Sequence, residues 1–157
     1  MSTRSMIFYD EPSGNVRGIY CHCDGYYDYV GILLQSYYNS PKKARELIKL
    51  GDLSSLGIEI GTKHDFNTSE VLDGTPYEKY CTAYHRDREE DFHCSNFTSE
   101  NKVTQIAKDF SFDYRFKDGQ WFAFDYKEGS NREWIPLKEV LDRNNILLKV
   151  PEEVERE

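Results

Sequence analysis

The chain has 157 residues, a formal net charge of −8 and a mean hydropathy of −0.76. This length suits one domain whose core is large enough to be stable without disulfides or metals. Aromatic residues make up 15% of the chain and can supply that core, because each ring removes a large area from water. The excess of acidic residues argues against direct nucleic-acid binding, since phosphate contacts need a local excess of Lys and Arg.

Two interpretations of the charge remain open at this point. The acidic surface serves solubility, or it competes with nucleic acid for a basic groove on another protein. No stretch approaches the roughly 18 apolar residues that span a bilayer, and the first six residues lack the apolar run of a secretory signal. We therefore expect a cytoplasmic protein without a membrane partner, whose four cysteines are reduced thiols.

The first half of the chain predicts a β-hairpin followed by two helices. Strand formers around a turn with Pro and Gly indicate the hairpin, and apolar residues spaced by three and four indicate the helices. Ser40 and Pro41 suit the N-cap and first turn of the second helix, and Gly51 suits its C-terminal end. The predicted elements are strands at 5–10 and 16–24 and helices at 28–38 and 41–50.

The second half begins with a loop-rich stretch. Asp118 and Gly119 lie between alternating aromatic segments, which is the strongest short-range signal for a hairpin. The predicted elements are a loop at 51–75, a strand at 76–86, a helix at 101–108, a hairpin at 110–126, a helix at 137–144 and a charged, frayed tail at 151–157. Together they predict a single α+β domain over residues 1–150. We expect a mainly antiparallel sheet, built from two hairpins plus a strand, with helices packed on one face.

Cys21, His22 and Cys23 are the first candidates for chemistry, because two thiols and an imidazole so close together suggest zinc. A further ligand would come from His85, His93 or Cys94. Structural zinc sites usually place paired ligands two to four residues apart on a turn, whereas these residues alternate along a predicted strand. The cysteines are better explained as small core residues, which points His22 and Asp24 to the opposite face. No metal or cofactor is expected.

The charged run 85–91 is the second candidate. On the predicted strand Arg86 and Arg88 share one face, where their forked donors suit phosphate or carboxylate, and Asp87 lies on the other. A solvated run of mutually paired charges at a strand end is the simpler explanation of the same residues.

Arg4 lies beside the second strand if the first hairpin forms. With His22, Arg86 and Arg88 it then lines a basic pocket for an anionic small molecule such as a nucleotide. The predicted ligand-binding residues are Arg4, His22, Asp24, Tyr26, Arg86, Asp87 and Arg88. An enzymatic alternative is a metal- or nucleotide-dependent hydrolase that uses His22, Asp24 and the run 86–88. Because the sequence has no P-loop, nucleophile elbow or H-E-x-x-H motif, we assign no catalytic residue and favour a binding role.

Four blocks of sequence follow one another within the first 90 residues. They are STRS at 2–5, YCHxDGY at 20–26, LGDxSSLG at 50–57 and YxRDRxE at 84–90. In this order they resemble a widespread group of uncharacterised proteins encoded by bacteriophages, prophages and related mobile elements. The aromatic hairpin followed by Trp134 and a helix is similar to the C-terminal part of that group. Cys23 and His85 depart from the group, in which an aromatic residue and a glycine are common at these positions.

The resemblance implies a phage-type accessory protein. Small acidic proteins of that origin often bind and disable host defence systems, including CRISPR effectors. We therefore expect an anti-CRISPR or other anti-defence inhibitor in the host bacterial cytoplasm, whose partner is a defence protein or complex such as a nucleic-acid-binding effector. It would act through its acidic surface, with Tyr and Trp side chains as anchors, or by sequestering an anionic signal molecule. A virion or replication accessory part is a third alternative.

Overall fold

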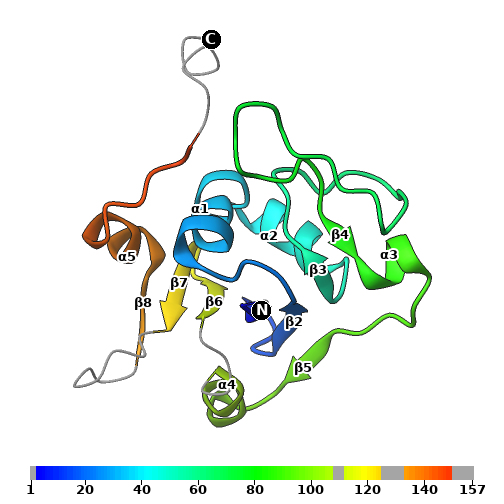
Figure 1. Ribbon diagram of the computed structural model, residues 1–157. Helices are drawn as coiled ribbons and strands as arrows, with labels where there is room; N and C mark the ends of the chain where they lie inside the picture. The colour runs from blue at the N-terminus through cyan, green and yellow to red at the C-terminus, as the bar shows by residue number, and fades with distance from the viewer. Residues whose placement is uncertain (1–2, 108–111, 125–132, 150–157) are drawn as a thin grey trace.

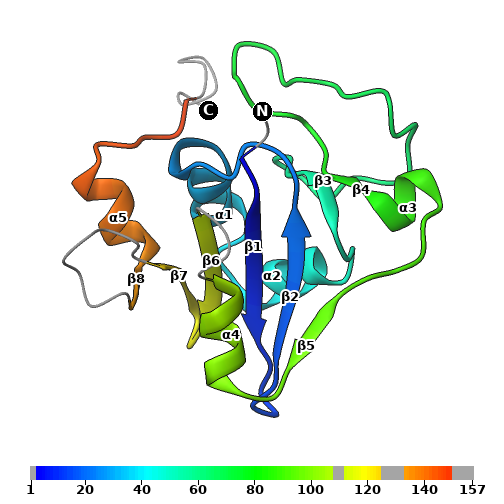
Figure 2. The same cartoon turned by 60° about the horizontal axis from the view of Figure 1, so that its bottom comes forward.

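The computed structural model describes residues 3–107, 112–124 and 133–149. A mostly antiparallel eight-stranded sheet forms its centre, with helices packed against it, which confirms the predicted α+β class. The strand order is β4-β3-β2-β1-β6-β7-β8, and β5 pairs with the free part of β2 (Figures 1 and 2). The predicted tail at 151–157, and the predicted segments at 108, 110–111 and 125–126, lie outside the described residues.

The first predicted hairpin and both predicted helices are present. β1 (Ser5–Asp10) pairs antiparallel with β2 (Val16–Cys21), and a π-helical turn (Tyr27–Gly31) leads into α1 (Ile32–Tyr37). The Ser40 hydroxyl accepts a hydrogen bond from the Lys43 amide at 3.2 Å, so it caps α2 (Pro41–Ile48) as predicted. Gly51, with a φ of +76°, follows the helix in the left-handed conformation that favours glycine.

The predicted strand at 76–86 is wrong for most of its length. β3 (Leu53–Ser55) runs parallel to β2, but only Thr82–Ala83 pairs with it as β4, and the chain then turns into α3 (Tyr84–Arg88). The cause lies in Asp87, whose carboxylate accepts a hydrogen bond from the Ala83 amide at 2.8 Å. This bond satisfies a donor at the start of the helix, in the manner of a capping side chain.

The second predicted hairpin is confirmed where the chain is described. β6 (Phe112–Lys117) and β7 (Gln120–Phe124) pair antiparallel around Asp118 and Gly119, whose φ values of +53° and +81° are those of a tight primed turn. The remaining elements are β5 (Ser95–Phe97), α4 (Glu100–Ala107), β8 (Trp134–Pro136) and α5 (Leu137–Arg143). β6 runs parallel to β1 and so joins the two hairpins into one sheet.

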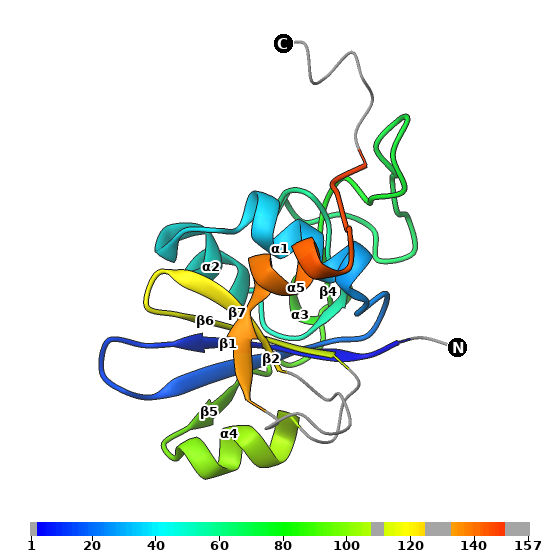
Figure 3. The ribbon, with the colours of Figure 1, turned by 90° about the vertical axis from the view of Figure 1, so that its left-hand side faces the viewer.

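Helices cover both faces of the sheet rather than one. α1, α2 and α5 lie on one face, and α4 lies on the other (Figure 3). The reason is that β1 is apolar on both sides: Ile7 and Tyr9 join the main core, whereas Met6 and Phe8 pack with Val103 of α4. A strand that is apolar on both sides needs a cover on each.

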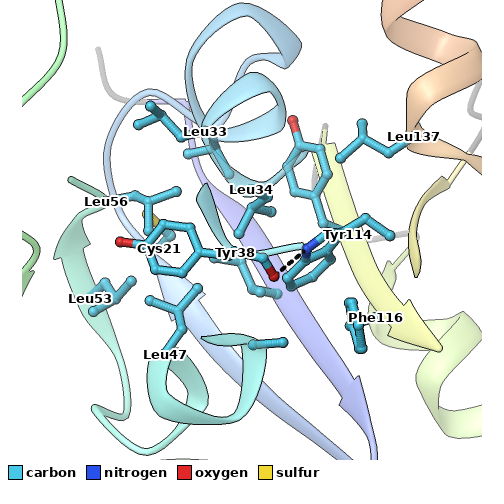
Figure 4. Packing of buried hydrophobic residues seen from close by; sticks show 14 of the residues in the cluster. Cys21, Leu33, Leu34, Tyr38, Leu47, Leu53, Leu56, Tyr114, Phe116 and Leu137 are labelled. Carbon is cyan, nitrogen blue, oxygen red and sulfur yellow. Dashed lines mark hydrogen bonds between the residues drawn. The ribbon is translucent and has the colours of Figure 1, made fainter. Parts of the chain in front are cut away.

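The main core lies between the sheet and the α1, α2 and α5 layer (Figure 4). Tyr38 stands at its centre with both polar ends bonded, since its hydroxyl donates to the Gly57 carbonyl at 2.6 Å and its carbonyl accepts from Trp121 Nε1 at 3.0 Å. The first of these bonds attaches the loop after β3 to the core. None of the described helices has the length and apolar character needed to cross a membrane.

Candidate functional site

The most distinctive surface belongs to the segment of residues 56–91, here called the acidic lobe, which includes the edge strand β4 and α3 (Figure 2). It holds nine acidic side chains against four Lys and Arg, and so carries five of the eight net negative charges. Seven of the acids are exposed: Glu59, Asp65, Glu70, Asp73, Glu89, Glu90 and Asp91.

Ion pairs neutralise only part of this charge. Lys79 lies 3.8 Å from Glu70, Lys63 lies 3.1 Å from Glu89, and Arg88 pairs with Glu90. In the described part of the chain, no Lys, Arg or His lies within 4 Å of the carboxylates of the other four: Glu59, Asp65, Asp73 and Asp91. The lobe therefore presents a negative field to solvent.

Arg86 and Asp87, two of the predicted ligand-binding residues, hold the lobe together from inside. Arg86 Nε and Nη2 donate to the two carboxylate oxygens of Asp87 at 2.9 and 3.1 Å. Nη1 also donates to the Ile60 carbonyl at 2.9 Å, and Nη2 to the Cys81 carbonyl at 2.7 Å. Because they lie on α3 rather than on a strand, Arg86 and Arg88 do not share a strand face as predicted.

The Asp87 carboxylate is buried and accepts four hydrogen bonds. Besides Arg86, the backbone amides of Ala83 and His64 donate to it at 2.8 and 3.1 Å. Burial works to raise the pKa of Asp87, but the bonds from Arg86, Ala83 and His64 outweigh it, so the pKa lies below its usual value. The group is an ionised cross-link between α3 and the loop.

His64, which sequence reasoning missed, belongs to the same network. Its Nδ1 lies 3.0 Å from the Thr62 carbonyl and 3.6 Å from the Asp87 carboxylate, and its Nε2 lies 3.2 Å from the Thr82 hydroxyl. In the neutral ring Nδ1 therefore donates and Nε2 accepts from Thr82. A cavity of about 130 Å³ is adjacent, lined by His64, Thr68, Ser69, Glu70, Tyr80 and Thr82. No motif marks His64, because its partners come from the loop, from β4 and from α3.

Glu78 is a half-buried acid of the lobe whose carboxylate is only partly hydrogen-bonded. Burial raises the pKa of its carboxyl group, and hydrogen bonds from Ser55 and Ser69 lower it again only in part. Its Oε2 atom is buried without a hydrogen-bond partner. The ionised form is thus held in an unfavourable environment.

We expect Glu78→Gln to raise the free energy of unfolding by about 1 kcal/mol at pH 7. A carboxyl whose pKa is raised on folding contributes stability below its unfolded pKa and loses that contribution as the pH rises through the folded value. The amide imitates the protonated form, so the gain over the parent should shrink towards zero at pH 4. Urea unfolding at both pH values measures this, with Glu70→Gln as an exposed control; an equal gain at pH 4 would contradict it.

Two tyrosines, Tyr20 and Tyr84, lie near Arg4, His22 and Arg88. Extending the β1–β2 register by one residue places Arg4 opposite His22, as predicted, and the His22 Nδ1 lies 2.6 Å from the Tyr20 hydroxyl. Burial raises the pKa of Tyr20, while the charge of Arg4 lowers it in part and Tyr84 raises it further. The Arg88 guanidinium lies 5.0 Å from the centre of the Tyr84 ring.

Asp24 and Tyr26 belong to a tight turn after β2. Asp24 is exposed with a φ of +55°, and Tyr26 is exposed with its ring edge-on to Phe112 at 5.7 Å. Gly25 between them is required by close packing, since a Cβ there would lie 3.0 Å from the Thr3 carbonyl oxygen. Within the described residues, no hydrogen bond or ion pair joins His22 or Asp24 to Arg86 or Asp87.

None of the four cysteines forms a disulfide. Cys21 and Cys81 are fully buried, which raises the pKa of each thiol, whereas Cys23 and Cys94 are half-buried. Cys21 is thus a small core residue, as predicted, whereas the same prediction is wrong for Cys23, which lies outside the core. In the parts of the chain that the structure describes, no three His, Cys, Asp or Glu side chains gather in a way that could hold a metal ion.

The chain matches no protein-family model, no curated protein and no solved structure. Its function is therefore inferred from its own charge distribution and contacts.

Proposed function

We propose that the protein is a phage-type accessory protein that binds and blocks a host defence component, with the acidic lobe as its contact surface. The observation that carries the proposal is the concentration of charge: the lobe holds five of the eight net negative charges, and four of its exposed acids have no cationic neighbour among the described residues. Such a surface is complementary to a basic groove that otherwise receives nucleic acid. The four sequence blocks support the phage-type origin.

Aromatic side chains on and beside the lobe supply anchors for such a contact. The Arg88 guanidinium lies 4.3 Å from the centre of the Phe66 ring, and the Phe66 and Tyr84 rings lie 5.5 Å apart. Phe92, directly after the lobe, is 45% exposed and packs edge-on against His85. Aromatic residues and Arg contribute most of the binding energy in many interfaces, so this cluster within an acidic surround suits an interface centre.

The rigidity of the lobe also favours binding through it. The Arg86–Asp87 network fixes the loop before any partner arrives, so little ordering entropy is lost on association. The same network favours protein contact over sequestration of an anionic molecule, because four of the Arg86 hydrogen bonds are made inside the protein and Arg88 is paired with Glu90. Of the predicted basic residues, mainly Arg4 and His22 would remain to bind an anionic molecule.

A charge-reversal experiment tests the proposal. The triple variant Glu59→Lys, Asp73→Lys, Asp91→Lys should bind the partner at least tenfold more weakly, because it reverses the field of the lobe without touching its internal bonds. The partner is first captured from lysate of a bacterial host with the parent protein, identified by mass spectrometry and purified. Affinity and inhibition of the partner's activity are then measured at two salt concentrations, since complementary charges bind more weakly as salt rises.

A matched control separates local charge from total charge. The variant Asp28→Lys, Glu133→Lys, Asp142→Lys reverses three exposed acids outside the lobe and has the same net charge. It should bind within about threefold of the parent. Equal losses in the two variants, or a captured partner whose activity the parent leaves unchanged, would overturn the proposal.

A further inference from the structure

Two basic side chains, Arg4 and His22, lie on the side of the sheet that faces α4, at the end where β1 begins and β2 ends. Tyr20 packs beside Met6 and Phe8 in the small core under α4, so it points to that side. Alternation along the strands places Arg4 and His22, which face each other across the hairpin, on the same side. In Figure 2, α4 lies towards the opposite end of these strands. Arg4 is exposed and His22 is half-buried, so both remain accessible to solvent.

The His22 ring is held in place by Tyr20. Its Nδ1 lies 2.6 Å from the Tyr20 hydroxyl, and the centres of the two rings lie 5.8 Å apart. A protonated imidazole carries a hydrogen on Nε2, and so does a neutral one whose Nδ1 accepts from the hydroxyl. Among the described residues Nε2 has no hydrogen-bond partner, and it is not a buried atom. This donor is therefore open to a ligand.

Arg4 supplies an unpaired positive charge beside His22. In the described part of the chain its guanidinium makes no hydrogen bond and no ion pair, in contrast to that of Arg86. Burial raises the pKa of Tyr20 and the charge of Arg4 lowers it in part, so the guanidinium lies within electrostatic reach of the Tyr20 hydroxyl. The guanidinium and the imidazole thus lie on either side of one phenol.

Hydroxyl groups from β3 and α3 border the two basic residues. Leu53 belongs to the main core, so its neighbour Ser54 points to the side of Tyr20. Burial raises the pKa of Tyr84 and a hydrogen bond from Ser54 lowers it in part, so these two hydroxyls are joined. Tyr84 in turn raises the pKa of Tyr20, which places the two phenols near each other. These neighbours add polar groups without adding negative charge.

The acids nearest in the chain do not offset Arg4. Asp52, directly before β3, accepts a hydrogen bond from the Tyr20 amide at 2.9 Å and pairs with His93 at 2.8 Å. Asp24, in the turn after β2, is exposed and forms no ion pair with a described residue. The surroundings of Arg4 therefore favour an anion.

We propose that Arg4 and His22 bind a phosphate monoester group, with Tyr20 holding the imidazole in position. The forked donors of a guanidinium match two phosphate oxygens, and the His22 Nε2–H donates to a third. Side chains directly opposite each other on antiparallel strands lie about 5 Å apart at Cβ, a spacing that one tetrahedral anion bridges.

This site is smaller than the basic pocket predicted from the sequence. Arg86 is bonded to carbonyl groups inside the protein, and Arg88 is paired with Glu90, so neither is needed for the anion. The two residues that bind the phosphate, Arg4 and His22, lie outside the acidic lobe. The site therefore does not rest on the proposed function, and the charge reversals in the lobe leave it unchanged.

Titration of the full-length protein separates the phosphate group from the molecule that carries it. In ¹H–¹⁵N spectra at constant ionic strength, inorganic phosphate at up to several millimolar should shift the Arg4 Nε–H and the His22 backbone amide saturably. Adenosine 5′-monophosphate should shift the same signals, and adenosine, which lacks the phosphate, should not. If the nucleotide binds about tenfold more tightly than phosphate, the ligand is a nucleotide; equal affinities identify the phosphate group alone as the ligand.

Arg4→Gln removes the guanidinium from an exposed position and should weaken phosphate binding about tenfold. Arg45→Gln is the matched control, because it removes the same charge from an exposed position of α2 on the other side of the sheet (Figure 3) and should bind like the parent. His22→Phe keeps a ring but removes the Nε2 donor, and should also weaken binding. The proposal is overturned if phosphate causes no saturable shift, if adenosine binds as tightly as the nucleotide, or if Arg4→Gln and Arg45→Gln bind alike.

Discussion

Replacing Arg115 by Met should lower the free energy of unfolding by about 3–5 kcal/mol. Arg115 joins three elements, because its guanidinium bonds Asp10 at the end of β1 and Glu100 at the start of α4 from a position on β6. Met keeps much of the apolar stem but leaves two carboxylates facing each other without a cation. The variant also loses the contact between the guanidinium and the Trp134 ring.

Lys117→Met is the matched control for this change. Lys117 lies two residues further along β6 and points to the same face, but it is exposed, so its removal should change stability by less than about 0.5 kcal/mol. Urea unfolding at pH 7 measures both variants. If Arg115→Met lowers the free energy of unfolding by less than about 1 kcal/mol, the ion pairs with Asp10 and Glu100 contribute little beyond the packing of the Arg115 side-chain stem.

The pH dependence of stability gives this prediction a second readout. Hydrogen bonds from Arg115 lower the pKa of Glu100 below its usual value. A carboxyl whose pKa is lowered on folding contributes stability above its unfolded pKa, which is about 4.3 for Glu, and loses that contribution as the pH falls through the folded value. The parent should therefore lose part of its stability on acidification below about pH 4, and Arg115→Met should lose correspondingly less.

The elements that the sequence predicts correctly are those decided by local chemistry. Ser40 caps α2 through its own neighbouring amide, and Asp118 and Gly119 adopt the positive φ values that their turn requires. Apolar spacing likewise located α1 and α5. None of these features depends on residues far away in the chain.

The features that sequence reasoning missed depend on long-range contacts. The segment 76–86 has the composition of a strand, but bonds from Asp87 to Ala83 and His64 bend it into a loop and a helix. In the sequence, Arg115 is one charged residue in a strand of alternating pattern. Its ion pair could not be predicted, because the partner Asp10 lies 105 residues earlier. The unbroken apolar run 6–9 in β1 could have indicated that both faces of this strand are apolar, and hence that the second face needs a cover such as α4.

Within the candidate site, too, local features could be predicted and long-range contacts could not. The cross-strand position of Arg4 and His22 follows from the hairpin register, which local turn chemistry determines. The inward orientation of Arg86 follows from carbonyls of Ile60 and Cys81, which belong to a loop without periodic sequence. Charge counts along the chain could have located the acidic lobe, but only the ion pairs show which of its acids remain uncompensated.

Asp87→Asn should unfold the acidic lobe locally while leaving the rest of the sheet intact. Both carboxylate oxygens accept two donors each: Oδ1 accepts from Arg86 Nε and the His64 amide, and Oδ2 from Arg86 Nη2 and the Ala83 amide. Neither orientation of the Asn amide avoids placing its NH₂ against two of these donors. The Arg86 guanidinium, whose side chain is 17% exposed, would also lose its counter-charge. We expect a local cost of about 3 kcal/mol.

Hydrogen exchange locates this loss. Backbone amides of the lobe that are bonded in the parent, such as those of Ile58, Glu59 and Cys81, should exchange about a hundredfold faster in Asp87→Asn, while those of β1 and β2 stay unchanged. Asp91→Asn removes the same charge from an exposed position of the lobe and should leave exchange unaltered. If the acidic lobe binds its partner as a preformed surface, Asp87→Asn should weaken binding more than Asp91→Asn does, although the two proteins have equal charge. Equal binding by both would show that charge suffices and that the Arg86–Asp87 network serves stability alone.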